Sequence, residues 1–245
     1  MGELIAVLSG KGGTGKTSVC AGIATALADS GASVLCIDCD VGLRNLDISL
    51  GLSHLGSLSF ADVCSGSYSL EQAAVHPQYA SLRFLTAPMN CDPADIDQKS
   101  FAAMLRQARS QFQYVFLDAP AGIDAGFRLA ARYADRVLLV TGADPAAVRD
   151  ARRAGELLEQ MGKADVRLIV NRISTKMIHA LGSNIDDIMD EAGLPLIGVV
   201  PEDPNITLAA AFEKPLLKHS KRGAAAAACR RIAKRVQGLS VPIDL

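Results

Sequence analysis

The chain has 245 residues, of which 49% are hydrophobic and 21% charged, and its formal net charge is −1. This balance predicts one large globular α/β domain over residues 1–245, with enough apolar side chains for an ample core. A charge near zero and an aromatic content of 4% without Trp argue against nucleic acid as a partner, although they leave a local basic patch open. We see neither a signal-peptide pattern nor an apolar run of membrane-spanning length, and therefore expect a cytoplasmic protein.

A strand-like apolar run over residues 4–8 leads into a glycine-rich loop, and a helix-like stretch follows over residues 18–28. The loop reads Gly-Lys-Gly-Gly-Thr-Gly-Lys-Thr over residues 10–17, which is the spacing of a phosphate-binding P-loop. Glycine permits the positive φ angles with which backbone N–H groups converge on phosphate oxygens, and the following helix directs its positive dipole end toward them. We expect Lys16 to reach the β- and γ-phosphates and the Thr17 hydroxyl to ligate Mg²⁺. The predicted phosphate-binding residues are Gly12, Gly13, Thr14, Gly15, Lys16, Thr17 and Ser18.

A second lysine, Lys11, stands early in this loop, directly after its first glycine. Two lysines this close repel each other unless a phosphate lies between them or one side chain points elsewhere. Two interpretations stay open from the residues alone. Lys11 is either a solvated surface residue or a group that reaches the nucleotide of a facing subunit.

Asp38 ends the next strand-like run, at residues 33–38, and Asp40 follows two positions later. Acids beside bound ATP repel its phosphates unless Mg²⁺ or a proton-accepting task compensates. We therefore predict that Asp40 orients or deprotonates the attacking water and that Asp38 supports Mg²⁺ through water. A capped turn would explain one of these acids but not both.

The cysteines carry no metal-site pattern. Cys36 and Cys39 form a Cys-x-x-Cys spacing, but alternation along a strand predicts that their side chains lie on opposite faces. No second pair follows at zinc-finger spacing. We expect all six cysteines to be free thiols in a reducing compartment.

The rest of the chain alternates strand-like and helix-like stretches. Further strands are expected over residues 82–86, 114–118, 137–141, 166–170 and 196–200, and helices over residues 98–111, 146–161, 185–192 and 224–236. We expect the first of these helices to begin near Asp95 and Asp97, and the next two to end at Gly162 and Gly193. This order predicts a doubly wound, mostly parallel sheet with helices on both faces, which binds ligands at the carboxyl ends of its strands.

Asp118 ends the apolar run at residues 114–118 and is therefore expected at a strand tip. A P-loop ATPase holds its Mg²⁺ at such a position, often through water, although a helix cap is the alternative role. Residues 119–124 would form a loop that senses the γ-phosphate. Gly122 could offer its backbone N–H there without a side chain in the way.

The run Lys-Gly-Gly-Thr-Gly-Lys-Thr at residues 11–17 resembles the deviant Walker A motif of the MinD/ParA family of ATPases. In that family the early lysine acts across an ATP-bound dimer. The resemblance therefore implies a homodimer that binds ATP and Mg²⁺, with Lys11 joining Lys16 and Asp40 as catalytic residues. It also implies slow hydrolysis of ATP to ADP and phosphate, because the product is a timed conformational state.

Three further segments resemble the MinD branch of this family, which positions the division site, and the match covers essentially the whole chain. They are Gly-Leu-Arg-Asn-Leu-Asp at residues 42–47, Pro-Ala-Gly-Ile at residues 120–123 and Val-Arg-Asp at residues 148–150. The resemblance implies two partners: a MinC-like inhibitor of division-ring assembly, and a MinE-like or polar-scaffold regulator. The adenine contacts that it implies are Asn171, Arg172, Pro201, Glu202 and Asp203.

Two features depart from the pattern of that branch. Thr14 stands where valine is usual, a small change that should be tolerated. The family usually ends in a short amphipathic helix that binds the membrane, but residues 224–236 carry no large apolar side chains beyond Ile232 and Val236. We expect this stretch to pack on the sheet with a basic solvent face, and the chain alone to bind liposomes weakly. Peripheral attachment to the inner face of the cell membrane stays open as an alternative location.

Other functions on the same fold are kept as alternatives: a ParA-like partition or flagellar-number ATPase, an amide synthase, or an iron–sulfur carrier. ParA proteins lack the segment at residues 42–47, and flagellar-number ATPases usually differ at Arg44. No glutaminase-like extension is visible, and Cys229 stands alone where a carrier needs a pair. A basic cluster keeps the DNA-binding partition class open, and it consists of Lys218, Lys221, Arg222, Arg230 and Arg231.

Overall fold

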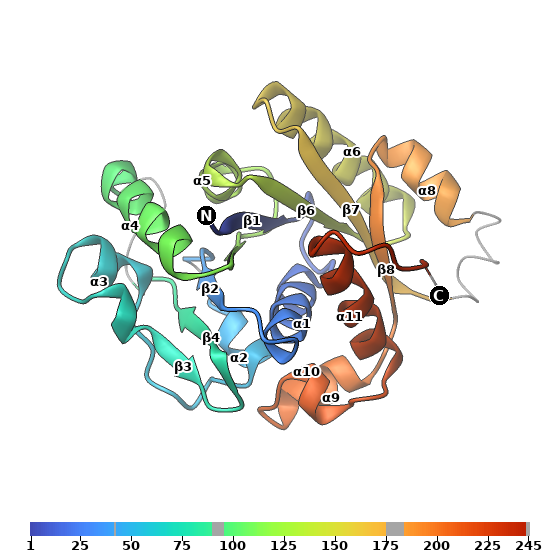
Figure 1. The fold of residues 1–245 in the computed structure, drawn as a ribbon. Coiled ribbons are helices and arrows are strands. Elements are labelled where there is room, and N and C mark those ends of the chain that lie inside the picture. Colours follow the sequence, from blue (N-terminus) through green and yellow to red (C-terminus); the bar gives the residue numbers. More distant parts are fainter. Residues whose placement is uncertain (42, 90–95, 175–183, 244–245) are drawn as a thin grey trace.

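A computed structural model describes residues 1–41, 43–89, 96–174 and 184–243. Its strands form one eight-stranded sheet in the order β3-β4-β2-β5-β1-β6-β7-β8 (Figure 1). The strands are β1 (Glu3–Leu8), β2 (Val34–Asp38), β3 (Ala74–His76), β4 (Tyr79–Leu85), β5 (Tyr114–Asp118), β6 (Arg136–Thr141), β7 (Asp165–Ile173) and β8 (Leu196–Pro201). Neighbouring strands pair in parallel except β3 and β4, which are antiparallel. The predicted doubly wound, mostly parallel sheet is confirmed.

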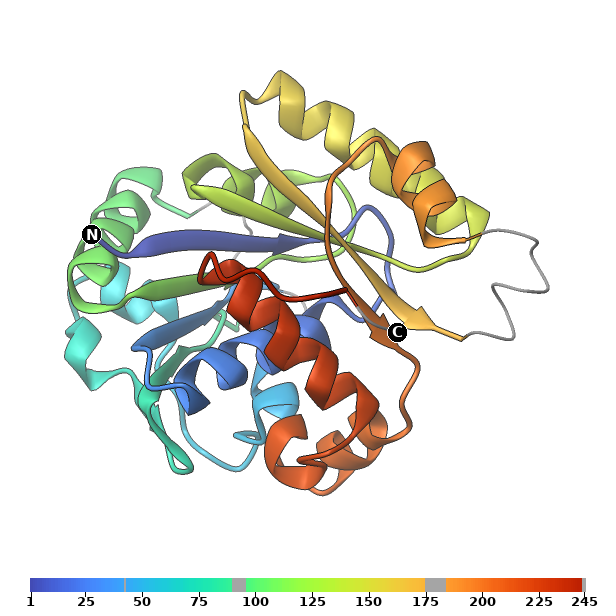
Figure 2. The same ribbon diagram turned by 45° about the vertical axis from the view of Figure 1, so that its right-hand side comes forward.

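Helices cover both faces of the sheet. They are α1 (Lys16–Asp29), α2 (Leu46–Leu50), α3 (Phe60–Cys64), α4 (Gln98–Gln111), α5 (Ala125–Tyr133), α6 (Pro145–Gln160), α8 (Ile185–Ala192), α9 (Asn205–Ala211), α10 (Leu216–His219) and α11 (Ala224–Val236), with a 3₁₀ turn at Leu70–Gln72. One core layer packs the sheet against α3, α4, α5, α6 and α8, and the other packs it against α1, α2, α9, α10 and α11. Figure 2 shows α1 and α11 side by side on the second face.

The central strands are buried on both faces, which explains their continuous apolar sequence. In β1, Leu4, Ala6 and Leu8 belong to one core layer, whereas Ile5 and Val7 belong to the other. Parallel strands that lie between two helical layers need apolar side chains at every position rather than at alternate ones. The runs found in the sequence therefore coincide with β1, β2, β4, β5, β6, β7 and β8, within a few residues.

Local signals placed several helix ends correctly. The Asp97 carboxylate accepts hydrogen bonds from the backbone N–H groups of Lys99 and Ser100, so it caps α4 as expected. Gly193 ends α8 with a φ of 68°, and Gly162 follows α6 with a φ of 74°. Asp95 lies outside the described residues.

The short elements were not predicted. β3 has three residues and forms an antiparallel edge, and α2, α3, α9 and α10 span four to seven residues each. Segments this short hold too few turns or alternations to establish a period, so tertiary packing decides their conformation. α5 was also missed, although it is longer, because its sequence directly follows the Pro- and Gly-containing loop at residues 119–124.

The cysteines behave as expected, and the last helix does so except at Arg235. α11 buries Ile232 and Val236 against α1 and β8, and Lys234 is exposed. Arg235 departs from the expected basic solvent face, because it is half-buried and its Nη1 donates to the Ile197 carbonyl oxygen of β8 at 2.8 Å. Cys36 and Cys39 belong to opposite core layers, and the cysteines that the structure describes are free; Cys91 falls outside it. Across the described ranges, no helix combines the length and apolar character needed to cross a bilayer.

His76 joins β3 to α2 and gives the fold a pH dependence. Its side chain is 2% exposed, and its Nδ1 accepts a hydrogen bond from the Gln78 backbone N–H at 3.0 Å. Nε2 must therefore carry the proton and donate to the Leu50 carbonyl oxygen, 2.8 Å away. Burial lowers the pKa of His76, so the folded state favours the neutral ring.

We expect His76 to stabilise the fold above its unfolded-state pKa of about 6.5 and to lose that contribution as pH falls. The check is urea unfolding at pH 7.5 and 5.5 for the wild type and His76→Gln. The variant should be less stable at pH 7.5, and the difference in unfolding free energy should shrink at pH 5.5, by at most about 1.4 kcal/mol per pH unit. An equal difference at both pH values would contradict the neutral, hydrogen-bonded ring.

Candidate functional site

The acidic residues predicted at strand tips meet beside the P-loop. In the parallel register Asp38 of β2 is level with Asp118 of β5, and Asp118 is level with Val7 of β1. β1 lies between β5 and β6 and leads into the P-loop at Ser9. The sheet therefore collects the P-loop and the two aspartates at one carboxyl edge, as predicted.

The P-loop has the backbone shape that phosphate binding needs. Gly13 and Gly15 have φ angles of 81° and 82°, a conformation that side chains other than glycine's rarely adopt. A Cβ at Gly15 would also collide with the Asn171 carboxamide. α1 begins at Lys16, and no described side chain caps its N-terminal N–H groups. These features leave positive partial charges aimed into the loop.

Lys16 and Asp118 form a buried ion pair. Lys16 Nζ lies 2.6 Å from Asp118 Oδ1, and the two side chains are 7% and 1% exposed. Lys16 Nζ also lies 3.2 Å from Thr17 Oγ1. Burial raises the pKa of Asp118, an effect that the Lys16 ammonium opposes. Lys16 therefore lies beside Asp118, the residue at the tip of β5 that was predicted to hold Mg²⁺.

Asp38 organises the loop after β2. Its Oδ1 accepts a hydrogen bond from the Asp40 backbone N–H at 2.9 Å, and its Oδ2 accepts one from the Leu46 N–H at 3.2 Å. Burial, followed by the neighbouring Asp118 charge, raises the pKa of Asp38 to about 7. Asp40 is half-buried at the same edge, and its Oδ1 accepts from the Leu43 N–H at 3.3 Å. A raised acid pKa marks a place where a bound cation would be stabilising.

Lys11 points away from Lys16. Its ammonium is 3.4 Å from Asp144 Oδ1, and the two side chains are 45% and 52% exposed. Lys11, Asp144 and Arg172 line a cavity of about 410 Å³ that opens beside the P-loop. The two lysines therefore avoid each other by taking separate carboxylates, one buried and one at the surface. Sequence reasoning missed Asp144, although its place before Pro145 at the start of a helix is an N-cap signal.

Gly122 lies in the loop between β5 and α5 with a φ of 93°. Its backbone N–H donates to the Ser9 carbonyl oxygen at 3.0 Å. The loop predicted to sense the γ-phosphate is thus tied to the residue before the P-loop. Contact of this N–H with a phosphate requires that bond to be exchanged.

The residues implied as adenine contacts line one cavity of about 860 Å³ beside the P-loop. They are Asn171, Arg172, Pro201, Glu202 and Asp203, and Gly13, Gly15 and Ser18 complete the P-loop side. Asn171 Nδ2 donates to the Thr14 carbonyl oxygen at 2.7 Å. The backbone of Arg172 has a φ of 58°. Its guanidinium lies 3.5 Å from the Glu202 carboxylate.

Asp203 differs from the other four, because its carboxylate is used within the protein. Oδ1 accepts from the Asn205 backbone and side chain, and Oδ2 accepts from the Ala225 N–H at the start of α11. Partial burial works to raise the pKa of Asp203, but these hydrogen bonds lower it below its usual value. Asp203 therefore shapes the cavity wall with its side chain already bonded.

Buried atoms without partners indicate that a ligand fits here. Ser9 Oγ, Thr14 Oγ1 and Asn171 Oδ1 are buried without a hydrogen-bond partner in the described part of the chain. Ser9 directly precedes the P-loop, Thr14 belongs to it and Asn171 lines its cavities, and a nucleotide would supply the missing polar groups. No cluster of three or more His, Cys, Asp or Glu side chains in the described ranges could hold a metal. Mg²⁺ at this edge would need phosphate oxygens and water beside the Thr17 hydroxyl, and Mg²⁺ sites usually include such ligands.

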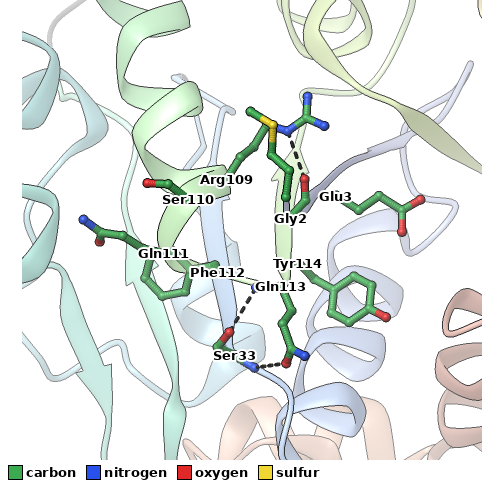
Figure 3. Close-up of a pocket in the computed structure, with 10 residues that line it drawn as sticks. Gly2, Glu3, Ser33, Arg109, Ser110, Gln111, Phe112, Gln113 and Tyr114 are labelled. Atoms are coloured by element: carbon green, nitrogen blue, oxygen red, sulfur yellow. Dashed lines mark hydrogen bonds between the residues drawn. The ribbon is translucent and has the colours of Figure 1, made fainter.

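A hollow of about 470 Å³ lies at the opposite end of the sheet, where β1, β2 and β5 begin (Figure 3). There Ser33 and Gln113 exchange two hydrogen bonds, and Arg109 Nε donates to the Gly2 carbonyl oxygen. These polar groups bond to one another, and the P-loop is at the other edge. We therefore assign the nucleotide site to the P-loop edge.

Comparisons with known proteins show the same nucleotide-binding class that the P-loop predicts. Residues 5–216 match the family described as the CobQ/CobB/MinD/ParA nucleotide binding domain. The septum site-determining protein MinD of Synechocystis sp. is 36% identical over 244 residues, which cover 99% of this chain and 92% of the relative.

Two solved structures share the fold over nearly the whole chain. One is MinD in the MinC:MinD cell division protein complex of Aquifex aeolicus, with a TM-score of 0.88 and 35% identity over 99% of this chain and 98% of that chain. The other is the septum site-determining protein MinD of Pyrococcus horikoshii complexed with Mg-ADP, with a TM-score of 0.83 and 26% identity over 96% of each chain.

Removal of Lys16 should make stability depend on pH through Asp118. We expect Lys16→Ala to keep the fold but to lose roughly 3 kcal/mol of unfolding free energy at pH 7.5, because it leaves a buried carboxylate unpaired. The pKa of Asp118 is raised by burial, so the loss should shrink at pH 5, where the folded state takes up a proton.

The control for this prediction is the double variant Lys16→Ala/Asp118→Asn, which removes both charges and should regain most of the loss at pH 7.5. Urea unfolding at both pH values measures each effect. A loss that does not change with pH, or a double variant no more stable than Lys16→Ala, would refute the buried pair.

Proposed function

We propose that this chain, which belongs to the MinD family of nucleotide-binding proteins, is an ATP-driven switch that dimerises and positions the division site. It would work as a single P-loop ATPase domain over residues 1–245. The observation that carries the proposal is the contrast between its two P-loop lysines. Lys16 is buried against Asp118, whereas Lys11 is exposed at the mouth of the site on a surface carboxylate.

The P-loop would bind the phosphates of ATP. Backbone N–H groups of Gly12, Gly13, Thr14, Gly15, Lys16, Thr17 and Ser18 would surround them, and Lys16 would exchange the Asp118 carboxylate for a phosphate oxygen. Mg²⁺, when bound, would neutralise charge on the β- and γ-phosphates. The Thr17 hydroxyl would hold it directly, and Asp38 and Asp118 would hold it through water.

Hydrolysis would need a group that orients the attacking water. Asp40 is our candidate, because it is a half-buried carboxylate at the same edge and can accept the proton of that water. Lys11 and Lys16 would stabilise the charge that develops on the phosphates. Gly122 would respond to the γ-phosphate by giving up its bond to Ser9.

We expect the nucleoside cavity to favour adenine over guanine. Asn171 Nδ2 is committed to the Thr14 carbonyl oxygen, which leaves Oδ1 as a buried acceptor without a partner in the described residues. The 6-amino group of adenine is a donor, whereas guanine carries a carbonyl at that place. Arg172, Pro201, Glu202 and Asp203 would form the remaining wall of this cavity.

Dimerisation would follow because Lys11 can exchange the Asp144 carboxylate for a phosphate at little cost in free energy. An exposed ion pair such as Lys11–Asp144 contributes about 0–1 kcal/mol. The phosphates of a nucleotide held by a second copy carry more charge than one carboxylate and lie in a site that the dimer closes to water. Lys11 would therefore leave Asp144 for the partner's nucleotide and join the two copies.

The ATP-bound homodimer would then recruit other proteins. The complex of Aquifex MinD with MinC supports the proposal that a MinC-like division inhibitor binds across the paired surface. A MinE-like regulator or a polar scaffold would control its release or placement. We place this cycle in the cytoplasm, with contact to the inner face of the cell membrane during recruitment.

Replacement of Asp40 tests the switch. Asp40→Ala should bind ATP with wild-type affinity but hydrolyse it on the order of a hundredfold more slowly, since water activation contributes about that much. The variant should therefore accumulate as a dimer with Mg²⁺-ATP and stay monomeric with ADP. Light scattering over a range of protein concentrations measures this, and a variant that stays monomeric with ATP would defeat the proposal.

Asp144→Asn tests the release of Lys11. Asparagine can still cap α6 through its side-chain oxygen, as Asp144 does for the Ala147 N–H, but it no longer holds the Lys11 charge. Because each dimer would release two such pairs, each worth up to about 1 kcal/mol, we expect the ATP-dependent dimer of this variant to form at up to about thirtyfold lower protein concentration. Lys11→Ala is the matched control and should not dimerise. A weaker dimer in Asp144→Asn would argue against Asp144 as the competing partner of Lys11.

A further inference from the structure

The loop between β2 and α2 carries Asp40 and is anchored at both ends by Asp38. The two oxygens of that carboxylate bind the Asp40 and Leu46 N–H groups. At the α2 end, Leu46 and Leu50 are fully buried, so the core holds the helix in place. Between these anchors, Leu43 is 71% exposed and has no such support.

Arg44 in this loop has an unusual backbone and one long-range contact. Its φ is 46°, in the left-handed region that residues with a Cβ rarely adopt, so the surroundings must maintain it. Its Nε donates a hydrogen bond to Thr86 Oγ1 at 2.9 Å, across 42 residues of sequence. Arg44 itself is half-buried.

Thr86 is a rigid partner for this contact. It directly follows β4, the strand that pairs with β2, and it is 3% exposed. Its N–H donates to the Leu58 carbonyl oxygen and its own carbonyl accepts from the Phe60 N–H, each at 2.9 Å. The hydroxyl that Arg44 uses is therefore held by a fixed backbone.

Two hydrogen bonds link the backbone at residues 43 and 44 to Asp40, so the position of Asp40 depends on the conformation of Arg44. The Arg44 N–H donates to the Asp40 carbonyl oxygen, and the Leu43 N–H donates to the Asp40 carboxylate, each at 3.3 Å. If the left-handed turn at Arg44 relaxes, both donors move. Asp40 would then lose these two hydrogen bonds together and keep the one from its own N–H to Asp38.

We propose that Arg44 is a positioning residue for ATP hydrolysis, because its bond to Thr86 holds the loop that sets Asp40 at the P-loop edge. The inference rests on the proposed function, in which Asp40 activates water. Arg44 need not touch the nucleotide in this role. The bond to Thr86 is formed within one copy of the chain and therefore exists before ATP binds.

The sharpest test is Thr86→Val, which removes the acceptor and keeps the shape of a buried side chain. Because Arg44 is half-exposed, water can take the place of the lost acceptor, so the melting temperature should change little. At saturating ATP, kcat should fall roughly tenfold with KM within about twofold, as expected when a catalytic group is misplaced but binding is intact. Thr86→Ser keeps the hydroxyl and should retain the wild-type kcat.

A second readout needs no nucleotide. Trypsin cuts after arginine only where the backbone can open, so cleavage after Arg44 should be several-fold faster in Thr86→Val than in the wild type or Thr86→Ser. Thr25→Val is the matched control, because Thr25 is another buried threonine, whose hydroxyl bonds to the Ala21 carbonyl oxygen within α1. It should leave both the cleavage rate after Arg44 and kcat unchanged.

Each result decides the matter. A Thr86→Val variant with wild-type kcat, with wild-type cleavage after Arg44, or with a raised KM in place of a lowered kcat overturns the inference. A wild-type chain that does not hydrolyse ATP removes the proposed function and this inference with it. That failure is recognisable because it appears before any substitution is made.

Discussion

The buried ion pair between Lys16 and Asp118 is the constraint on which the site depends. A charge buried without its partner costs about 3–5 kcal/mol, so the P-loop and the tip of β5 must stay together when no phosphate is present. That requirement matches the register of β1 and β5, in which Val7 pairs with Asp118. The register of β5 and β2 in turn places Asp38 beside Asp118. Lys11 is the loosely held lysine of the loop, because its ion pair with the exposed Asp144 carboxylate contributes far less to stability.

The sequence predicts much of this arrangement because its signals are local. A parallel strand buried on both faces is a continuous apolar run, and the run that ends in Asp118 matches β5 residue for residue. The P-loop is similarly readable, since Gly13 and Gly15 adopt the positive φ that their residue type suggests. Parallel strands then bring Asp38 and Asp118 to one edge without further information.

The partners of these residues could not be predicted from the sequence. Lys16 bonds to a residue 102 positions away, Lys11 to one 133 positions away, and Arg44 to one 42 positions away. The Gly122 N–H likewise bonds to the Ser9 carbonyl oxygen. Such contacts depend on how loops leave neighbouring strands, and neither periodicity nor capping patterns encode that. They also determine which bonds must break when a nucleotide binds.

In the proposed cycle, phosphate replaces the carboxylate in both lysine pairs, Lys16–Asp118 and Lys11–Asp144. A crystal structure of Asp40→Ala with Mg²⁺-ATP tests this most directly, because slowed hydrolysis should preserve the nucleotide. We expect Lys16 Nζ on phosphate oxygens rather than on Asp118, and two copies face to face with each Lys11 turned from Asp144 toward the partner's nucleotide. A nucleotide-bound single copy in which Lys16 stays on Asp118 and Lys11 stays on Asp144 would contradict the account.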